Sequence, residues 1–170
     1  GVCFDAKGFL YVVDSGNGRV QKFDEKGGFI LQFGRTGEYE GEMSSPTDIA
    51  ILGGRAYVTD TENRRIAEFD DCGNFLNNHS LDLERPRGII RWKGSLLISD
   101  EKKGLLVWNP YDGTRKWFLS WGKDEETFGR LTSATVDRDG YLYCVDNHRS
   151  EVLLFSPLER RYSNLDVEIT

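Results

Sequence analysis

The chain has 170 residues, of which 38% are hydrophobic and 29% are charged, and its formal net charge is −6. This length and composition suit one ordinary domain with its own core, and no run approaches the roughly 18 apolar residues of a membrane-spanning helix. No signal peptide is recognisable, and the acidic balance counts against a nucleic-acid-binding protein, which usually carries a basic face.

One segment recurs four times along the chain. The first copy, Phe4–Asp24, returns as Ala50–Asp70, and weaker copies follow at Ile90–Asn109 and Val136–Phe155. An aspartate follows the central apolar run of each copy: Asp14, Asp60, Asp100 and Asp146. These aspartates are 40 or 46 residues apart, and a repeat of about 40–50 residues built from strands and turns is typical of a propeller blade.

The first repeat predicts four strands, at Val2–Asp5, Phe9–Val13, Arg19–Phe23 and Phe29–Phe33. The apolar run Phe9–Val13 suits a central strand that is buried on both faces between neighbouring blades. Turns that contain glycine, such as Gly27-Gly28, supply the backbone angles of the hairpins between the strands.

The sequence therefore predicts an all-β fold, a β-propeller of four-stranded antiparallel blades, with blades at about 1–34, 46–80, 86–122 and 131–170 of one domain. Four blades can close into a ring, although propellers built from such repeats more often have about six. An open arc would expose an apolar blade face at each end. We therefore expect the chain to form part of a larger ring, with a self-associating half ring and a closed four-bladed ring as the alternatives.

Three loops between the repeats, at residues 34–46, 77–87 and 122–131, are candidates for function. Loops on a rigid scaffold commonly carry binding residues, so we expect these loops to be presented to a protein partner. The residues predicted at that contact are Arg35, Glu38, Tyr39, Glu42, Arg85, Arg87, Trp117, Trp121, Lys123 and Phe128.

The residues that define the repeat resemble a known family. The first copy contains Val2-x-Phe4-Asp5, Tyr11-Val12-x-Asp14 and Asn17-x-Arg19-Val20, and the second contains Tyr57-Val58-x-Asp60 and Asn63-x-Arg65-Ile66. These motifs are similar to the NHL repeat. The resemblance covers almost the whole chain, and it is strong in the first two copies and degenerate in the last two.

The resemblance implies a radial propeller whose central funnel and loop faces bind proteins, peptides, glycans or, in some relatives, RNA. The leading function is therefore a non-catalytic scaffold that binds a protein partner. A few similar propellers are metal-dependent enzymes, either lyases or lactonase-like, so an enzyme of that kind is the alternative and an RNA-binding propeller a further one. Many bacterial chains with this repeat are exported, which favours an extracytoplasmic location.

The chain offers few metal ligands. Its two histidines, His79 and His148, occupy unlike positions in their repeats, and a catalytic zinc usually needs three protein ligands. Asp137–Gly140 faintly resembles a calcium loop but lacks the third ligand and the distal glutamate, so a hairpin turn explains it better. The sequence thus predicts no catalytic residue, no cofactor and no metal ligand.

The repeated polar residues have structural explanations. Each repeated aspartate is expected to accept backbone N–H bonds from its loop, and the alternative is a ring of carboxylates that attracts a cation. Arg19 and Arg65 are expected to pair with a carboxylate in the same or an adjacent blade, and the alternative is that they bind a ligand.

Positive charge is concentrated in two places, at Lys102-Lys103 with Arg115-Lys116 and at Arg85 with Arg87. These residues could bind an acidic partner or form a solvated face. The RNA-binding alternative would depend on Lys102, Lys103, Arg115 and Lys116.

Aromatic residues gather in the third repeat: Trp108, Tyr111, Trp117, Phe118 and Trp121. They are expected to pack between blades, with an aromatic anchor for a partner as the alternative. Of the three cysteines, Cys3 and Cys144 are expected to pack as small apolar residues in strands, and Cys72 to be exposed in a turn. No disulfide is expected.

Overall fold

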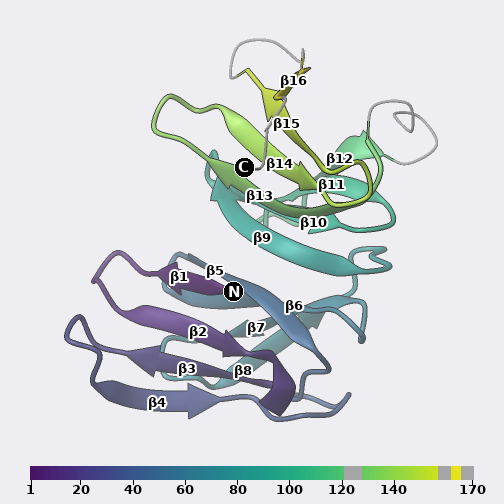
Figure 1. The fold of residues 1–170 in the computed structure, drawn as a ribbon. Helices are drawn as coiled ribbons and strands as arrows, with labels where there is room; N and C mark the ends of the chain where they lie inside the picture. Colours follow the sequence, from purple (N-terminus) through teal and green to yellow (C-terminus); the bar gives the residue numbers. More distant parts are fainter. Residues whose placement is uncertain (121–127, 157–161, 166–170) are drawn as a thin grey trace.

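The computed structural model describes residues 1–120, 128–156 and 162–165, which form four sheets of four antiparallel strands (Figure 1). The first sheet contains β1 (Val2–Phe4), β2 (Leu10–Asp14), β3 (Arg19–Phe23) and β4 (Phe29–Phe33). The second contains β5 (Pro46–Leu52), β6 (Arg55–Asp60), β7 (Arg65–Phe69) and β8 (Phe75–His79). The third contains β9 (Pro86–Trp92), β10 (Ser95–Asp100), β11 (Gly104–Trp108) and β12 (Arg115–Ser120). The fourth contains β13 (Leu131–Val136), β14 (Leu142–Asp146), β15 (Glu151–Phe155) and β16 (Tyr162–Leu165).

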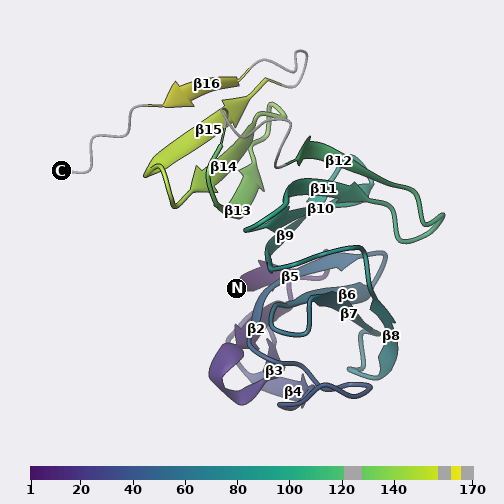
Figure 2. The ribbon, with the colours of Figure 1, turned by 90° about the vertical axis from the view of Figure 1, so that its right-hand side faces the viewer.

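The four sheets are the blades of a β-propeller, as the sequence predicts. Within each blade the strands run in chain order (Figures 1 and 2). Residues of the innermost strands β1, β5, β9 and β13 line a central cavity. The one helical feature among the described residues is a short 3-10 turn at Ser15–Asn17, and no helix in this part of the chain is long and apolar enough to cross a membrane.

Successive blades pack face to face. Strands β1 and β2 contact β5, strands β5 and β6 contact β9, and strands β9 and β10 contact β13. The described residues of the first and fourth blades do not pack on one another to this extent, and Figure 1 shows these two blades apart. The apolar core of the protein therefore lies between neighbouring blades.

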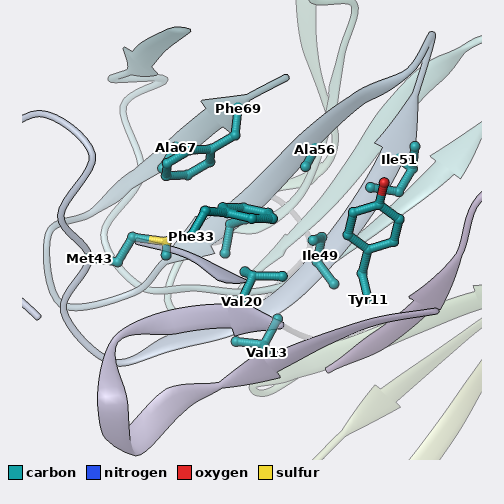
Figure 3. Close-up of a cluster of buried hydrophobic side chains, with 11 residues drawn as sticks. Tyr11, Val13, Val20, Phe33, Met43, Ile49, Ile51, Ala56, Ala67 and Phe69 are labelled. Carbon is teal, nitrogen blue, oxygen red and sulfur yellow. The ribbon is translucent and has the colours of Figure 1, made fainter. Parts of the chain in front are cut away.

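The continuous apolar runs of the central strands follow from this arrangement. Every residue of Ala56–Asp60 in β6 is buried, because the second blade is covered on both faces. The interface between the first two blades contains Tyr11, Val20 and Phe33 on one side and Ile49 and Phe69 on the other (Figure 3). Burying such a side chain contributes about 1.5–3 kcal/mol to stability.

Equivalent positions at successive interfaces carry chemically different side chains. Lys22 in β3 is buried against the second blade, and its Nζ lies 5.0 Å from the centre of the Tyr11 ring and donates to the Asp71 carbonyl at 3.0 Å. The corresponding residue of the second blade is Glu68, because each pairs with the tyrosine of its central strand. The next blade has Val107 at this position, paired with Leu97.

Glu68 forms a compact polar cluster at the interface with the third blade. Its carboxylate accepts from Arg55 Nη1 at 2.6 Å and from the Tyr57 hydroxyl at 3.2 Å, and it lies 2.7 Å from His79 Nε2. Burial by itself raises the pKa of Glu68, but Arg55 and His79 outweigh burial and the pKa is lower than usual. The ring of Trp108 from the third blade covers His79, with 4.6 Å between ring centres.

The outward face of the first blade is apolar and uncovered among the described residues. By strand register, Val2 and Phe4 occupy the positions that Ile49 and Ile51 occupy in the second blade. Val2 is 65% and Phe4 61% exposed, whereas Ile49 is 2% and Ile51 7% exposed. In the second blade, by contrast, the residues at these positions are covered by the neighbouring blade.

Candidate binding face

The segments that lead into the blades gather at one end of the propeller. Segments 34–45, 80–85 and 128–130 contact the aspartates that end the central strands β6, β10 and β14. We call this end, with the loops that follow those strands, the loop face. It lies on the right in Figure 1 and faces the viewer in Figure 2.

The repeated aspartates hold the loop face together in two ways. The Asp100 carboxylate accepts backbone N–H bonds of 2.8–3.0 Å from Glu84, Arg85, Lys102 and Lys103. Asp146 likewise accepts from the backbone of Gly129, Arg130, His148 and Arg149. Asp14 and Asp60 instead accept mainly side-chain donors from their Asn-x-Arg motifs: Asn17 and Arg19, and Asn63 and Arg65.

The predicted backbone N–H donors are confirmed at Asp100 and Asp146, whereas Asp14 and Asp60 have a structural role mainly through side-chain donors. Both oxygens of each carboxylate accept hydrogen bonds from the chain itself, which counts against a ring of free carboxylates. Arg19 and Arg65 pair with the aspartate of their own blade, at 2.8 Å in each case. The backbone donors of the last two repeats explain how those repeats can lack the Asn-x-Arg motif.

Two of the buried aspartates have pKa values shifted in opposite directions. Burial by itself raises the pKa of Asp146, but the surrounding backbone N–H groups outweigh burial and leave this pKa below its usual value. At Asp60 burial dominates over the donors Asn63, Ser44 and Arg65, so the pKa is raised. The balance between burial and hydrogen-bond donors therefore differs between these two aspartates.

Arg65 holds the loop between the first two blades in place. Its guanidinium donates to Asp60 and to the backbone carbonyls of Glu38 at 2.9 Å, Tyr39 at 3.2 Å and Glu42 at 3.0 Å. Asn63 adds a bond of 2.9 Å to the carbonyl of Gly37. One arginine from the second blade thus bonds to three carbonyls of this loop.

The four residues predicted in this loop lie together. Glu42 accepts from the Tyr39 N–H at 3.1 Å and from Arg35 Nε at 2.9 Å, and these two contacts lower its pKa. Met43 is buried and anchors the loop in the core. Tyr39 is 73% exposed, and Arg35 and Glu38 are exposed beside it. The loop therefore presents a tyrosine and two charges on an ordered backbone.

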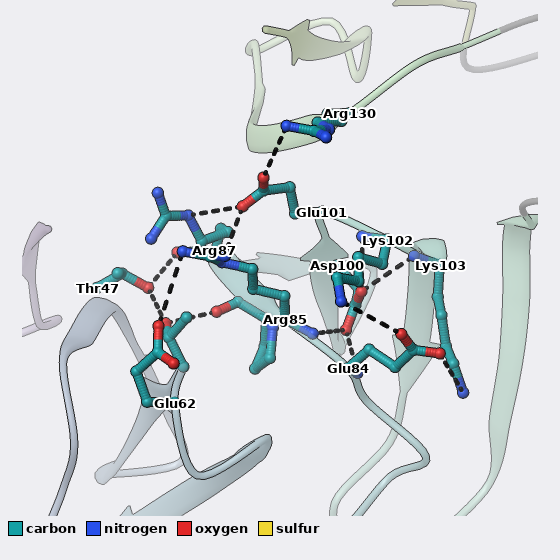
Figure 4. A network of polar contacts seen from close by, with 12 residues as sticks. Thr47, Glu62, Glu84, Arg85, Arg87, Asp100, Glu101, Lys102, Lys103 and Arg130 are labelled. Carbon is teal, nitrogen blue, oxygen red and sulfur yellow. Dashed lines mark hydrogen bonds and ion pairs between the residues drawn. The ribbon is translucent and has the colours of Figure 1, made fainter. Parts of the chain in front are cut away.

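Arg85 and Arg87, the predicted basic pair, belong to a larger cluster (Figure 4). The Glu101 carboxylate lies 3.1 Å from Arg85 Nε, 3.4 Å from Arg87 Nε and 3.8 Å from Nη1 of Arg130, which leads into the fourth blade. Glu62 of the second blade lies 3.7 Å from Arg85. This arginine cluster (Arg85, Arg87 and Arg130) thus joins three blades at the loop face.

The other predicted basic group is not assembled as one patch. Lys102 and Lys103 pair with carboxylates of the segment before the third blade, Asp82 and Glu84. They precede β11, whereas Arg115 pairs with Trp108 at the opposite end of that strand. The lysines are therefore neutralised locally and do not form one surface with Arg115.

Phe128 was predicted at the partner contact, and this is wrong because the side chain is 1% exposed and lies in the core between the third and fourth blades. Trp117 is partly buried against the interface of the second and third blades, while Phe118 on the opposite face of β12 packs toward Phe155. Alternation along the strand thus divides the predicted aromatic group between two interfaces. Trp121 and Lys123 lie outside the described residues.

The two histidines lie in different blades, His79 in β8 and His148 in the loop after β14. Among the described residues, the only group of three potential metal ligands close enough to share an ion is Asp70, Asp71 and Cys72, a hairpin turn in which Asp70 is already bonded to the N–H of Cys72. The Asp137 carboxylate accepts from Asp139 and Tyr141 in another such turn, which confirms the hairpin interpretation.

The central cavity has a volume of about 490 Å³. Its polar lining includes Cys3, Asp48, Arg91, Ser133 and Thr135. Burial raises the pKa of the Cys3 thiol and of Asp48. Cys3 is therefore a protonated, weakly nucleophilic thiol at neutral pH. All three cysteines are free, with Cys144 buried and Cys72 exposed as expected.

Sequence reasoning missed Arg130 and Glu101. Arg130 lies directly before the innermost strand of its blade, as Ser45 and Arg85 do in theirs. Alignment at this position, rather than at the aspartates alone, would have placed Arg130 beside Arg85. No comparable signal distinguishes Glu101 from other loop glutamates.

Comparison with known proteins supports the fold and part of the repeat assignment. The NHL repeat family matches residues 1–23, which end with β3. No curated protein matches the chain in sequence. Solved structures with the same fold include the nidogen–laminin complex, with 20% identity, a TM-score of 0.80, and coverage of 98% of this chain and 64% of the other.

Two lyases also share the fold. A catalytically inactive variant of virginiamycin B lyase from Staphylococcus aureus, solved with quinupristin, has 11% identity and a TM-score of 0.73, covering 99% of this chain and 55% of the lyase. A streptogramin B lyase has 16% identity and a TM-score of 0.71, covering 98% and 53%. The chain thus spans about half the length of these lyases. At these identities the similarity concerns the fold alone.

Proposed function

We propose that this β-propeller is a non-catalytic scaffold that binds a protein partner through its loop face. The observation that carries the proposal is the ordered loop 34–45, where Arg65 satisfies three backbone carbonyls while Tyr39 remains 73% exposed. A tyrosine on a fixed backbone provides contact area at low entropic cost, which is typical of protein-binding surfaces. The nidogen propeller, a structural neighbour, was solved in a complex with laminin.

We also propose that the uncovered face of the first blade binds a further blade. The uncovered apolar face of the first blade, and the partial coverage of the longer neighbouring structures, support a chain that works with further blades. These blades belong either to the same polypeptide or to a second copy. The four blades at about 1–34, 46–80, 86–122 and 131–170 are then one section of a larger ring.

Site-specific photocrosslinking tests the loop face as a partner site. A photoreactive phenylalanine analogue is placed at Tyr39, and in a matched variant at Tyr111, which is also exposed but lies in a hairpin turn beyond β11. We expect a protein adduct from position 39 in the native source, and its loss when Arg65 is also replaced by alanine. Equal adducts from positions 39 and 111 would assign the contact to a different surface.

A further inference from the structure

We propose that the arginine cluster is a binding site for carboxylate side chains of an acidic peptide. This inference rests on the proposed function as a protein-binding scaffold and specifies the chemistry of the partner. It concerns Arg85, Arg87 and Arg130, which come from the segments that begin the third and fourth blades.

The cluster carries more positive than negative charge. Three guanidinium groups surround one largely buried carboxylate, that of Glu101, and a second carboxylate, that of Glu62, reaches only Arg85 at 3.7 Å. Arginine stays protonated in proteins, so the cluster keeps an excess of positive charge. This excess is notable in a chain whose net charge is −6.

Several donors of the cluster remain available. Arg87 approaches Glu101 through Nε at 3.4 Å and Arg130 through Nη1 at 3.8 Å. Within residues 1–120 and 128–156, the terminal nitrogens of Arg87 have no hydrogen-bond partner, and Arg85 Nε faces Glu101 without an aligned hydrogen bond. Such planar groups of donors match a carboxylate in two-point geometry.

The backbone under the cluster is held by hydrogen bonds. The N–H of Arg85 and that of Arg130 each bond to a repeated aspartate at 2.9 Å. The carbonyl of Arg87 accepts from the Thr47 hydroxyl of the second blade at 2.7 Å. Binding a carboxylate therefore orders only side-chain ends, which keeps the entropic cost low.

The surroundings favour a peptide over a nucleic acid. Glu62 lies beside Arg85, and the neighbouring Lys102 and Lys103 are paired with Glu84 and Asp82, so the positive charge does not continue beyond the cluster. The unbalanced charge is confined to three side chains, which suits a few separate carboxylates. Nucleic-acid sites usually spread positive charge over a whole face.

Fluorescence anisotropy with the intact chain tests this site. The probes are a labelled oligoglutamate, an oligoglutamine of the same length and an oligouridine. We expect oligoglutamate to bind most tightly, and Arg87→Ala and Arg130→Ala each to weaken it about tenfold, as loss of a charge-assisted bond does. Arg138→Ala, an exposed arginine in the β13–β14 turn, is the matched control and should leave binding unchanged. Glu101→Gln removes the resident carboxylate and should strengthen binding.

The opposite results are equally clear. The inference would be overturned if the Arg87, Arg130 and Arg138 variants bound oligoglutamate with equal affinity. It would also be overturned if the intact chain bound oligouridine more tightly than oligoglutamate. If Arg87→Ala fails to fold, Arg87→Lys keeps the charge but loses the planar geometry, and it should still weaken the binding of oligoglutamate. A photocrosslink from position 39 that persists without oligoglutamate binding would reject this site alone and leave the proposed function standing.

Discussion

Single aspartates at the end of each central strand determine how the loop face is held. Asp100 and Asp146 bind four backbone N–H groups each, while Asp14 and Asp60 depend on asparagine and arginine side chains. The same residue type in the same place therefore has different electrostatic surroundings. The pKa of Asp146 is lowered and that of Asp60 is raised.

This difference predicts a pH dependence. Because the pKa of Asp146 is lower in the folded chain than in the unfolded one, where it is about 3.9, its ionised form stabilises the fold above about pH 4. That contribution is lost as the pH falls through the lowered pKa. We expect Asp146→Asn to reduce the free energy of unfolding at neutral pH and to flatten the acid side of the stability curve, measured by urea unfolding.

Asp60→Asn is the control for this experiment. Since the pKa of Asp60 is raised in the folded chain, protonation of this group favours the folded state as the pH falls from neutral through the raised value. Replacing Asp60 should therefore make the free energy of unfolding fall more steeply with decreasing pH, rather than less steeply. If the stability curve flattened at acid pH in both variants, the opposite pKa shifts assigned to Asp146 and Asp60 would be contradicted.

At the scale of strands and loops, the repeat pattern was enough to predict the strands of the first blade. Alternation and glycine turns placed them within a residue or so, because each strand lies between covered faces and closes with a local turn. The loop 34–45 was recognised as a candidate, but its conformation depends on Arg65, which bonds to carbonyls 23 to 27 residues away. Phe128 was misjudged for the same reason, since residues from two blades bury it.

The role of Arg65 in the loop can be tested against its counterpart in the first repeat. Arg65 is nearly buried and bonds to Asp60 and three carbonyls, whereas the more exposed Arg19 bonds only to Asp14 and Gln32. We expect Arg65→Ala to cost about 3 kcal/mol of stability, as removal of one partner of a buried pair does. It should also expose the amides of residues 35–43 to hydrogen exchange.

Arg19→Ala should have a much smaller effect on stability and none on exchange in that loop. Denaturant unfolding and hydrogen exchange followed by mass spectrometry give both quantities. Unchanged exchange at residues 35–43 in the Arg65 variant would mean that Met43 and the internal pairs hold the loop without the arginine.

At the scale of the whole molecule, the propeller is organised by its interfaces. Each blade buries its apolar side chains against its neighbours, and the outward face of the first blade lacks such cover among the described residues. Exposed apolar area of this kind favours association. This surface is the one that we propose for contact with further blades or a second copy.

Substitutions at equivalent positions of the first and second blades test whether the exposed face of the first blade mediates association. We expect Val2→Thr with Phe4→Thr to reduce concentration-dependent association in sedimentation velocity, with little change in stability, because these side chains are exposed. Ile49→Thr with Ile51→Thr should cost about 2 kcal/mol or more per residue, because these side chains are buried. Association that is unchanged in the first variant would show that another surface is responsible.

The buried Lys22 and Glu68 have a consequence for how such a chain can evolve. They occupy equivalent positions, yet one needs a carbonyl and aromatic rings, and the other needs an arginine and a histidine. If a copy of the first repeat were inserted after the second, the copied Lys22 would face the third blade without the Asp71 carbonyl that it bonds in the second. Glu68 would keep Arg55 and His79, because both belong to its own blade. The repeats have thus ceased to be interchangeable modules, and growth by internal duplication requires that these junction residues change first.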